Sequence, residues 1–373
     1  MKLQELQTPA ILVRKNILER NLTAYQSKCD QFGKRLWPMV KTHKSTELGR
    51  RQAELGADGF LCGTLDECET LCEEGFENIM YAYPVAGKVS CRRAALLAKK
   101  CRFYARIDGM EAAEMLNEAA KAEEVVINYT IIIDCGLHRF GVLPEQAVFL
   151  AEKLRTFQFL KFCGISSHSG HVYGEAVPER VPLYAREERD ALHRAAADLK
   201  KAGFDVQLVT TGSTPTFQYN VDDEYIQIYH PGNYVFNDAI QMGNGTASEE
   251  DCALVIYATV ISHPCDDLFI CDAGAKCLGL DQGAHGNSSV QGFGYVVGHP
   301  ELMVAGLSEE VGKLHVSGAT NLKVGDRIMI IPNHACSAAN LTDYLICVDD
   351  EGEVTETIAV DIRGNGRNPI HSQ

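Results

Sequence analysis

Short apolar runs alternate with longer amphipathic segments between about residues 36 and 240. Segments 64–74 and 178–200 repeat their apolar positions with a helical period, which predicts two helices there. Thr64 and Glu67 have the spacing of a capping box, and Gly75 is placed to end the first helix. The runs between helices are typical of buried strands. They begin near Leu36, Gly59, Asn78, Cys101, Val125, Phe159, Asp205 and Tyr225.

Eight strands that alternate with helices predict a (β/α)8 barrel of the TIM type, and we expect it to span residues 18–243. A doubly wound open sheet is the alternative. That architecture often carries G-x-G-x-x-G after an early strand, and this sequence has no such motif there.

The pattern changes after about residue 245, where long helical segments are no longer found. Strand-like runs at 252–261, 268–271, 327–331 and 344–348 are separated by Gly, Asp and Pro, which predicts an all-β domain. We expect this domain to comprise residues 244–373 together with 1–17. An early strand-like run at 10–13 can pair with either domain.

Composition restricts the class of partner. The chain has 373 residues and a net charge of −15, which argues against nucleic acid or an anionic membrane as a partner. We find no apolar signal region at the N-terminus and no apolar run of membrane-spanning length. The 14 cysteines are scattered through apolar stretches and form no Cys-x-x-Cys pair. They are typical of buried thiols in a reducing cytoplasm.

A candidate nucleophilic lysine, Lys41, lies at the end of the first apolar run. Catalytic groups of a barrel collect at the C-terminal ends of its strands. Burial there favours the neutral amine, so Lys41 can serve Schiff-base chemistry. The alternative interpretation is an exposed loop lysine.

Two further motifs follow strand-like runs. Arg139 lies in the motif that begins at Asp134, and an ion pair with Asp134 at the barrel rim is its alternative interpretation. His168, His171 and Tyr173 follow the run that begins at residue 159. At a barrel mouth these side chains are candidates for ring stacking and for contact with a substrate. A purely structural role is the alternative for His171.

Two turns combine glycine with small polar residues. Such turns expose backbone N–H groups near a helix N-terminus, which suits a phosphate dianion. Ordinary βα turns are the alternative, and no Walker sequence is present. The candidate phosphate-binding residues are Thr211, Gly212, Ser213, Gly232, Asn233 and Tyr234.

A candidate metal motif, His334-Ala335-Cys336, lies in the predicted β domain. In an extended segment alternate side chains share a face, so both could reach one metal ion. Imidazole with thiolate favours zinc. A buried cysteine beside a structural histidine is the alternative.

These motifs, in this order along the whole chain, resemble the fold type III (alanine racemase-type) pyridoxal-phosphate enzymes. More narrowly, Pro38-x-x-Lys41-Thr42-His43-Lys44 is similar to the cofactor-lysine region of the D-serine dehydratase and D-threonine aldolase branch. The resemblance implies that Lys41 holds pyridoxal 5'-phosphate, with Arg139 near its phenolic oxygen and His168 beside its ring. It also implies that the two turns bind its phosphate and that the histidine–cysteine motif binds a metal, with Zn2+ expected.

The implied activity is zinc-dependent β-elimination from a small D-3-hydroxy amino acid, D-serine being the simplest, to a 2-oxo acid and ammonia. Lys41 would take the Cα proton, His171 and Tyr173 would contact the substrate, and the metal would hold the β-hydroxyl. Dehydratases of the branch carry cysteine as the second ligand, whereas the aldolases tend to carry aspartate. Residues 308–310 resemble another motif of the branch, but Val311 stands where its histidine is expected. A cytoplasmic homodimer is expected.

Three alternatives remain. A D-threonine aldolase would release an aldehyde instead of ammonia. An amino-acid racemase would need an acid or base on each face of the cofactor and no metal. A non-catalytic pyridoxal-phosphate carrier would turn over no D-amino acid, although the added β domain and the His334–Cys336 motif argue against it.

Overall fold

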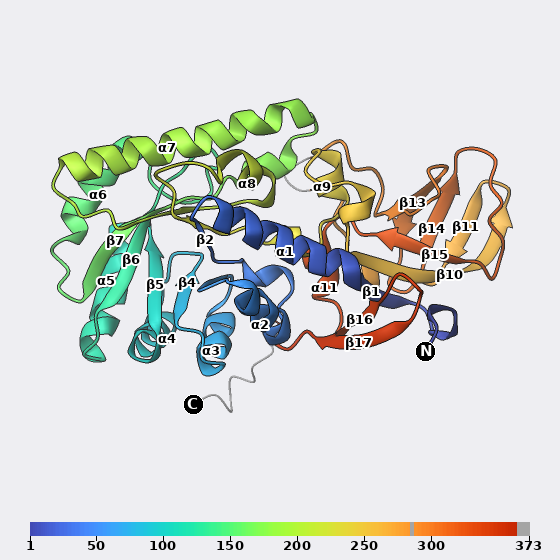
Figure 1. Cartoon of the computed structure of the whole chain (residues 1–373), viewed down its shortest axis with the longest axis horizontal. Coiled ribbons are helices and arrows are strands. Elements are labelled where there is room, and N and C mark those ends of the chain that lie inside the picture. The colour runs from blue at the N-terminus through green and yellow to red at the C-terminus, as the bar shows by residue number, and fades with distance from the viewer. Residues whose placement is uncertain (284–286, 364–373) are drawn as a thin grey trace.

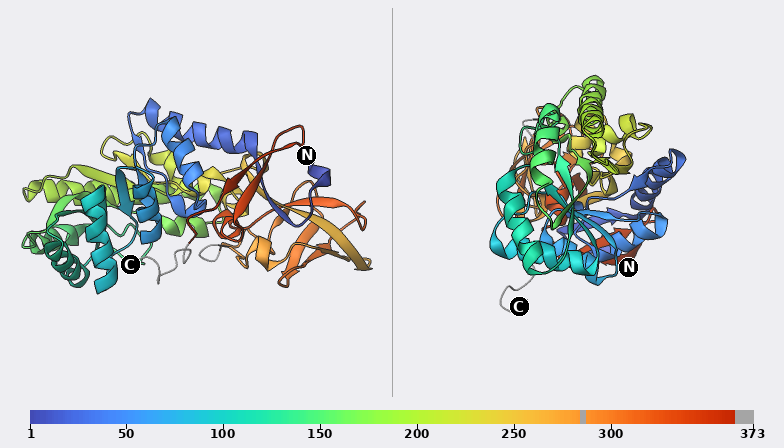
Figure 2. Two further views of the ribbon diagram at one scale, coloured as in Figure 1. Left: turned by 90° about the horizontal axis from the view of Figure 1, so that it is seen from below. Right: turned by 90° about the vertical axis from the view of Figure 1, so that its left-hand side faces the viewer.

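The computed structural model describes residues 1–283 and 287–363. Two sheets divide these residues into a barrel and a β domain that lie end to end (Figure 1). The further views show the β domain as an extension beyond one end of the barrel (Figure 2). Within the described ranges, we find no helix of the length and apolar character needed to cross a membrane.

The first sheet has eight parallel strands in the order β2-β9-β8-β7-β6-β5-β4-β3. A parallel bridge from Met39, just after β2, to Leu61 in β3 brings its two edges together. The predicted barrel is therefore confirmed, and the open doubly wound sheet is excluded. The strands are β2 (Arg35–Leu36), β3 (Phe60–Cys62), β4 (Asn78–Tyr81), β5 (Arg102–Ile107), β6 (Ile127–Ile132), β7 (Leu160–Ser166), β8 (Leu208–Thr211) and β9 (Ile228–Tyr229).

Helices surround the barrel strands. The Thr64 hydroxyl accepts a hydrogen bond from the Glu67 backbone N–H at 3.1 Å and begins α3, as the sequence predicts. Gly75, with φ +90°, follows the end of that helix. The helices of this half are α1 (Lys15–Gln31), α2 (Thr46–Leu55), α3 (Leu65–Glu73), α4 (Lys88–Lys100), α5 (Met110–Ala122), α6 (Ala147–Leu154), α7 (Val181–Lys201), α8 (Thr214–Asn220) and α9 (Ala239–Gly243).

The second sheet has nine strands and forms the β domain. β1 (Ala10–Arg14) pairs antiparallel with β10 (Leu254–Cys265) and parallel with β16 (Tyr344–Val348), so the early run belongs to this sheet and not to the barrel. The remaining elements are β11 (Leu268–Cys271), α10 (Ala275–Leu278), β12 (Tyr295–Val296), β13 (Leu302–Leu307), β14 (Gly312–Val316), β15 (Arg327–Ile331), α11 (Ala335–Ala339) and β17 (Val354–Ala359).

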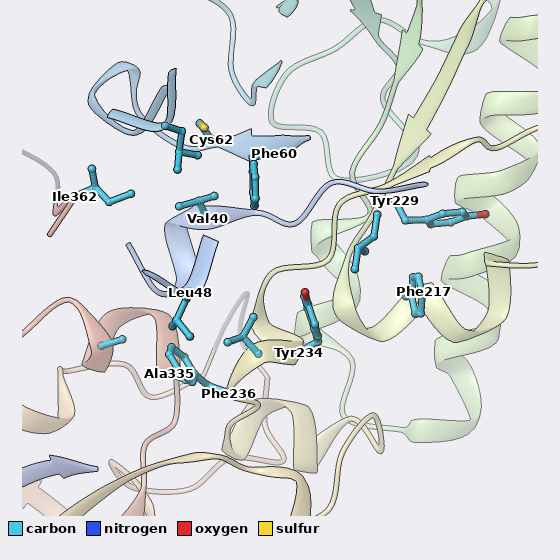
Figure 3. Close-up of a cluster of buried hydrophobic side chains, with 14 of the residues drawn as sticks. Val40, Leu48, Phe60, Cys62, Phe217, Tyr229, Tyr234, Phe236, Ala335 and Ile362 are labelled. Carbon is cyan, nitrogen blue, oxygen red and sulfur yellow. The ribbon is translucent and has the colours of Figure 1, made fainter. Parts of the chain in front are cut away.

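The two domains share one apolar core. Val40, Leu48 and Phe60 of the barrel half pack in the same cluster as Ala335 and Ile362 of the β half (Figure 3). Four of these side chains are at most 1% exposed, and Ile362 is 4% exposed. Burial of apolar surface is the main stabilising contribution to such contacts. The shared core therefore fixes α11 against the loop that carries Lys41.

Candidate cofactor and metal site

A cavity of about 130 Å³ lies at the barrel mouth, where side chains that follow the barrel strands meet α11. Every barrel strand contributes at least one lining residue, and the β domain contributes His334 and Cys336. The C-terminal ends of barrel strands are where this fold carries catalytic groups.

Lys41 lies in a short 3-10 turn, Val40–Thr42, directly after β2, and its side chain lines the cavity. The nearby Lys44 is engaged elsewhere, because its amine forms a buried ion pair with Glu67. Glu67 is 0% exposed and also accepts a hydrogen bond from the Gly63 N–H at 2.6 Å. Lys41 is therefore the lysine of this motif that faces the cavity.

His168 lines the cavity and its Nδ1 lies 2.6 Å from the Gly212 carbonyl oxygen. Burial, with a smaller contribution from the Lys41 charge, lowers the pKa of His168 to about 3. The imidazole is consequently neutral near pH 7, and Nδ1 donates its proton to that carbonyl. Neutral His168 presents a flat surface to the cavity without adding charge.

Arg139 lies at the exposed rim of the cavity, with its guanidinium 4.5 Å from the centre of the Phe140 ring. The alternative ion pair with Asp134 is not formed. Asp134 instead accepts hydrogen bonds from the Gly136 N–H at 2.9 Å and from His138, whose Nδ1 is 2.8 Å away. Arg139 is therefore available to a bound molecule.

The two predicted phosphate turns converge on the cavity through Gly212, Ser213, Gly232 and Asn233. Within the described part of the chain, the backbone N–H groups of these four residues donate no hydrogen bond. A Cβ at Gly212 would lie 2.5 Å from the His230 backbone nitrogen, so only glycine fits there. Four such backbone N–H groups around one cavity are suited to bind an anion with several oxygens.

Tyr173 lines the cavity, but three other predicted site residues do not. The Thr211 hydroxyl donates to Glu188 at 2.5 Å, and the Tyr234 hydroxyl accepts from Gln52 at 2.9 Å. His171 packs against the Tyr184 ring, with ring centres 5.0 Å apart. The Thr211 side chain is directed toward Glu188, and the next residue, Gly212, is the one that lines the cavity.

The metal motif departs from the predicted extended conformation. His334 is the N-cap residue of α11 and Cys336 lies in its first turn. Asp238 explains the change, because its carboxylate accepts a hydrogen bond from the Ala335 N–H at 2.9 Å and so caps α11 from the barrel side. The alanine-rich sequence that follows favours a helix. The prediction that both side chains face one site does not depend on the extended conformation, since both line the cavity.

The imidazole and thiol of this motif polarise each other. Burial disfavours the charged imidazole, but Cys336 beside it raises the pKa of His334 to about 9. Burial likewise opposes the thiolate, but the His334 charge holds the pKa of Cys336 below its usual value. The Cys336 Sγ lies 3.3 Å from the Thr42 hydroxyl, next to Lys41.

The motif provides an incomplete metal shell. Residues 1–283 and 287–363 contain no group of three or more His, Cys, Asp or Glu side chains placed to hold a metal ion. An ion held by His334 and Cys336 would therefore keep positions for water or a substrate, as catalytic zinc does.

Three buried charged residues at the site were not predicted. Arg106 on β5 lines the cavity and is 2% exposed. Asp238 and Glu188, both 0% exposed, hold α11 and the β8 turn in place. The position of Arg106 within the apolar run after residue 101 could have indicated a functional residue, because a charged side chain is rarely buried in a strand unless it has a partner. Glu188 lies in a charged stretch of the sequence and Asp238 lies in none of the predicted strands, so neither gave such a signal.

Comparison with known proteins agrees with this geometry. Residues 13–239 match the family described as alanine racemase, N-terminal domain, and residues 253–348 match a serine dehydratase domain. D-serine dehydratase from Dictyostelium discoideum is 30% identical and is aligned over 93% of this chain and 95% of its own length.

Two solved structures are similar over almost the whole chain. One is a cysteine-to-alanine variant of D-threo-3-hydroxyaspartate dehydratase in the metal-free form, with 28% identity, a TM-score of 0.89 and coverage of 96% of this chain and 98% of that one. The other is D-threonine aldolase from Filomicrobium marinum, with 27% identity, a TM-score of 0.88 and coverage of 97% of both chains. The chain therefore belongs to the alanine racemase N-terminal domain family of fold type III pyridoxal-phosphate enzymes, in the branch that adds a serine dehydratase domain.

Proposed function

We propose that the protein is a D-serine dehydratase, which converts a D-3-hydroxy amino acid to a 2-oxo acid and ammonia. One observation carries the proposal: Lys41 and the His334–Cys336 pair line the same cavity from different domains. The Cys336 Sγ lies 3.3 Å from the hydroxyl of Thr42, the neighbour of Lys41. A base and a site for the leaving hydroxyl are thus within reach of one small substrate.

The residues of the barrel mouth fit pyridoxal phosphate. The backbone N–H groups of Gly212, Ser213, Gly232 and Asn233, which donate to no described residue, match a phosphate dianion, and Lys41 is the amine that would hold the cofactor. His168, neutral through burial, would lie against the ring, and Arg139 is available to its phenolic oxygen. Pyridoxal phosphate, when bound, is an electron sink that makes the Cα–H bond of an amino acid acidic.

The remaining chemistry belongs to side chains of this chain. The Lys41 amine would accept the Cα proton, since it is the lysine of its motif that faces the cavity. Tyr173 accepts a hydrogen bond from the Thr214 N–H at 3.2 Å, and burial raises the pKa of its hydroxyl. Tyr173 therefore stays neutral and can orient a substrate or the cofactor ring.

His334 and Cys336 would hold a divalent metal, with zinc favoured by a nitrogen and a sulfur ligand. The ion, when bound, supplies a Lewis acid for a hydroxyl group. Cysteine as the second ligand favours elimination over Cα–Cβ cleavage, in line with the branch's dehydratases. The proposal also includes a homodimer and a cytoplasmic location. The described cysteines are all free, which is compatible with a reducing compartment.

A substrate screen tests the proposal. Protein loaded with pyridoxal phosphate and zinc is offered D-serine, D-threonine, D-threo-3-hydroxyaspartate and their L-enantiomers, and ammonia and aldehyde are measured separately. Ammonia from the D-enantiomers alone is the expected result. Aldehyde as the main product would assign the aldolase reaction, racemisation without either product would assign a racemase, and no turnover would assign a carrier.

A further inference from the structure

Arg106 is a buried cation that has no carboxylate partner among the residues that the structure describes. It lies on β5, is 2% exposed and lines the cavity. None of the salt bridges among residues 1–283 and 287–363 includes it, and burial lowers its pKa to about 10. An unpaired charge inside a protein costs free energy, so such a residue needs a compensating group.

The hydrogen bonds of Arg106 place its guanidinium in the middle of the barrel mouth. Its Nε donates to the Ser166 hydroxyl at 2.7 Å, its Nη1 to the Ala82 carbonyl at 3.3 Å and its Nη2 to the Ser167 carbonyl at 3.1 Å. Ala82 follows β4, whereas Ser166 and Ser167 lie at the end of β7. β4 and β7 are on opposite sides of β5 in the strand order. All three acceptors are neutral, so the hydrogen bonds orient the cation without neutralising it.

Donors remain on this guanidinium. Arginine has five N–H groups, and the three hydrogen bonds above use one on each nitrogen. Nη1 and Nη2 each keep a second N–H for which the described side chains and backbone provide no acceptor. Two N–H groups of one fork match an anionic oxygen or a carboxylate.

We propose that Arg106 binds an anionic oxygen of the molecule that fills the cavity, supplied either by the phenolate of the cofactor ring or by the carboxylate of the amino-acid substrate. The inference deepens the proposed function and rests on it. The phosphate is a third anion, but it has its own donors at Gly212, Ser213, Gly232 and Asn233, after β8 and β9. β9 is four places from β5 in the strand order, so these donors lie across the barrel mouth.

The test compares neutral variants with a matched arginine. Arg106→Met and Arg106→Gln remove the charge, and Gln can still bond to Ser166. Arg106→Lys keeps the charge. Arg14→Met is the control, because Arg14 is also partly buried and bound to carbonyl oxygens of Glu249 and Cys252, but does not line the cavity.

Melting of the cofactor-free protein is the first measurement. Removal of an uncompensated charge should raise the melting temperature of Arg106→Met or Arg106→Gln, by about 2–4 °C or more. Arg14→Met should melt below the wild type, because Arg14 is only partly buried and the Glu249 and Asp251 carboxylates lie near its charge, so its removal loses favourable interactions. This measurement does not require any catalytic activity.

Ligand titrations then identify the anion. Pyridoxal phosphate and pyridoxal are titrated into cofactor-free protein, and D-alanine into loaded protein. If the ring phenolate is the partner, both neutral variants should bind pyridoxal and pyridoxal phosphate about 10-fold or more weakly, with Arg106→Lys close to the wild type. If the carboxylate is the partner, only D-alanine should lose affinity by that factor.

Two outcomes overturn the inference, whatever the melting temperatures are. One is unchanged affinity for all three ligands in the neutral variants, as in Arg14→Met. The other is a loss confined to pyridoxal phosphate, which would place Arg106 at the phosphate. Failure of the wild type to bind either form of the cofactor would instead refute the proposed function, and melting would then decide whether Arg106 is an uncompensated charge.

Discussion

The barrel mouth and the β domain build the cavity in different ways. The barrel contributes residues that lie in or directly after each of its eight strands, or in the loops that follow them. The β domain contributes two side chains from the start of one short helix. Donors for a phosphate, a lysine and a flat neutral histidine all belong to the barrel half. Cofactor binding should therefore depend on the barrel alone, and the β domain should decide which bond of the substrate breaks.

Loss of the barrel's lysine tests the first half of this comparison and should have the largest effect. Lys41→Ala removes both the covalent attachment and the base. Ammonia release from D-serine should fall by about 10²- to 10⁴-fold, the usual contribution of general acid–base catalysis. Borohydride reduction of the cofactor-loaded wild type should attach the cofactor irreversibly to Lys41, and peptide mapping can locate this label.

Lys44→Met is the matched control for that variant. It should keep the label on Lys41 but lose about 3–5 kcal/mol of stability, because Glu67 would remain buried without its partner. A label found on Lys44 would refute the assignment of Lys41.

Loss of the β-domain ligands tests the second half. Cys336→Ala or His334→Ala should reduce ammonia release by about 10²-fold or more, since each bound metal contributes several kcal/mol to a departing oxygen. The affinity for pyridoxal phosphate should stay near that of the wild type, because its donors lie in the barrel. A chelator should reproduce the loss and added zinc should reverse it. Metal-free protein, verified by elemental analysis, that still eliminates at the full rate would rule out this role.

Cys336→Asp sharpens the same comparison. It keeps a ligand but replaces a soft sulfur by a hard oxygen. Elimination should fall while aldehyde formation from D-threonine persists or rises, and the ratio of ammonia to aldehyde measures the change. A ratio equal to that of the wild type would show that the second ligand does not select the reaction.

The strands of the barrel half could be predicted from the sequence more completely than those of the β half. The eight strands begin within three residues of the predicted positions, because buried parallel strands form continuous apolar runs between amphipathic helices. In the β domain the short or irregular strands β12, β13, β14 and β17 were not predicted. β12 has only two residues, and the pairings of β13 with β14 and of β16 with β17 each contain a register shift. The regular alternation that marks a strand in the sequence is therefore weak there.

The site shows the same division. Lys41, Arg139, His168, Gly212 and Gly232 all line the cavity, since strand ends converge in a barrel. The predicted extended conformation of the metal motif was wrong. The residue that caps α11 is Asp238, which is 97 positions from Ala335 in the sequence. A tertiary contact of that kind overrides the local pattern and cannot be read from it.

Asp238 joins the two halves, and its replacement should have an intermediate effect. Its carboxylate accepts hydrogen bonds from the Ala335 N–H at 2.9 Å, the Gln241 N–H at 3.0 Å and the Asn233 amide at 2.5 Å. In Asp238→Asn one of these donors would face an N–H group, which loosens α11. Zinc affinity should fall about 10- to 100-fold, as for other residues that orient metal ligands. Cofactor affinity should fall less.

Asp223→Asn is the control for Asp238→Asn. Asp223 is also buried and accepts hydrogen bonds from the Tyr225 and Ile226 N–H groups at 2.9 and 3.1 Å, but it contacts neither α11 nor the cavity. Its loss should lower stability and leave zinc affinity unchanged. Equal zinc affinities in the two variants would show that Asp238 does not hold the metal motif.

The smallest expected effect concerns histidines, which the two halves use in opposite ways. In the barrel half burial lowers the pKa of His43 to about 4 and that of His230 to about 3, whereas in the β domain the pKa of His334 is raised to about 9.

An unfolded histidine has a pKa of about 6.5. Between pH 6.5 and 4 the unfolded chain therefore binds protons at His43 and His230 that the folded protein does not bind. Their contribution to stability is complete above pH 6.5 and is lost as the pH falls. His334 is protonated in the folded protein throughout this window, and in the unfolded chain it becomes protonated as the pH falls through about 6.5. The free energy of unfolding, measured by urea denaturation in the presence of a chelator, should decrease over this window by at most about 1.4 kcal/mol per pH unit for each histidine. His43→Gln and His230→Gln should each reduce that slope. Equal slopes in the wild type and both variants would mean that these imidazoles are protonated in the folded barrel.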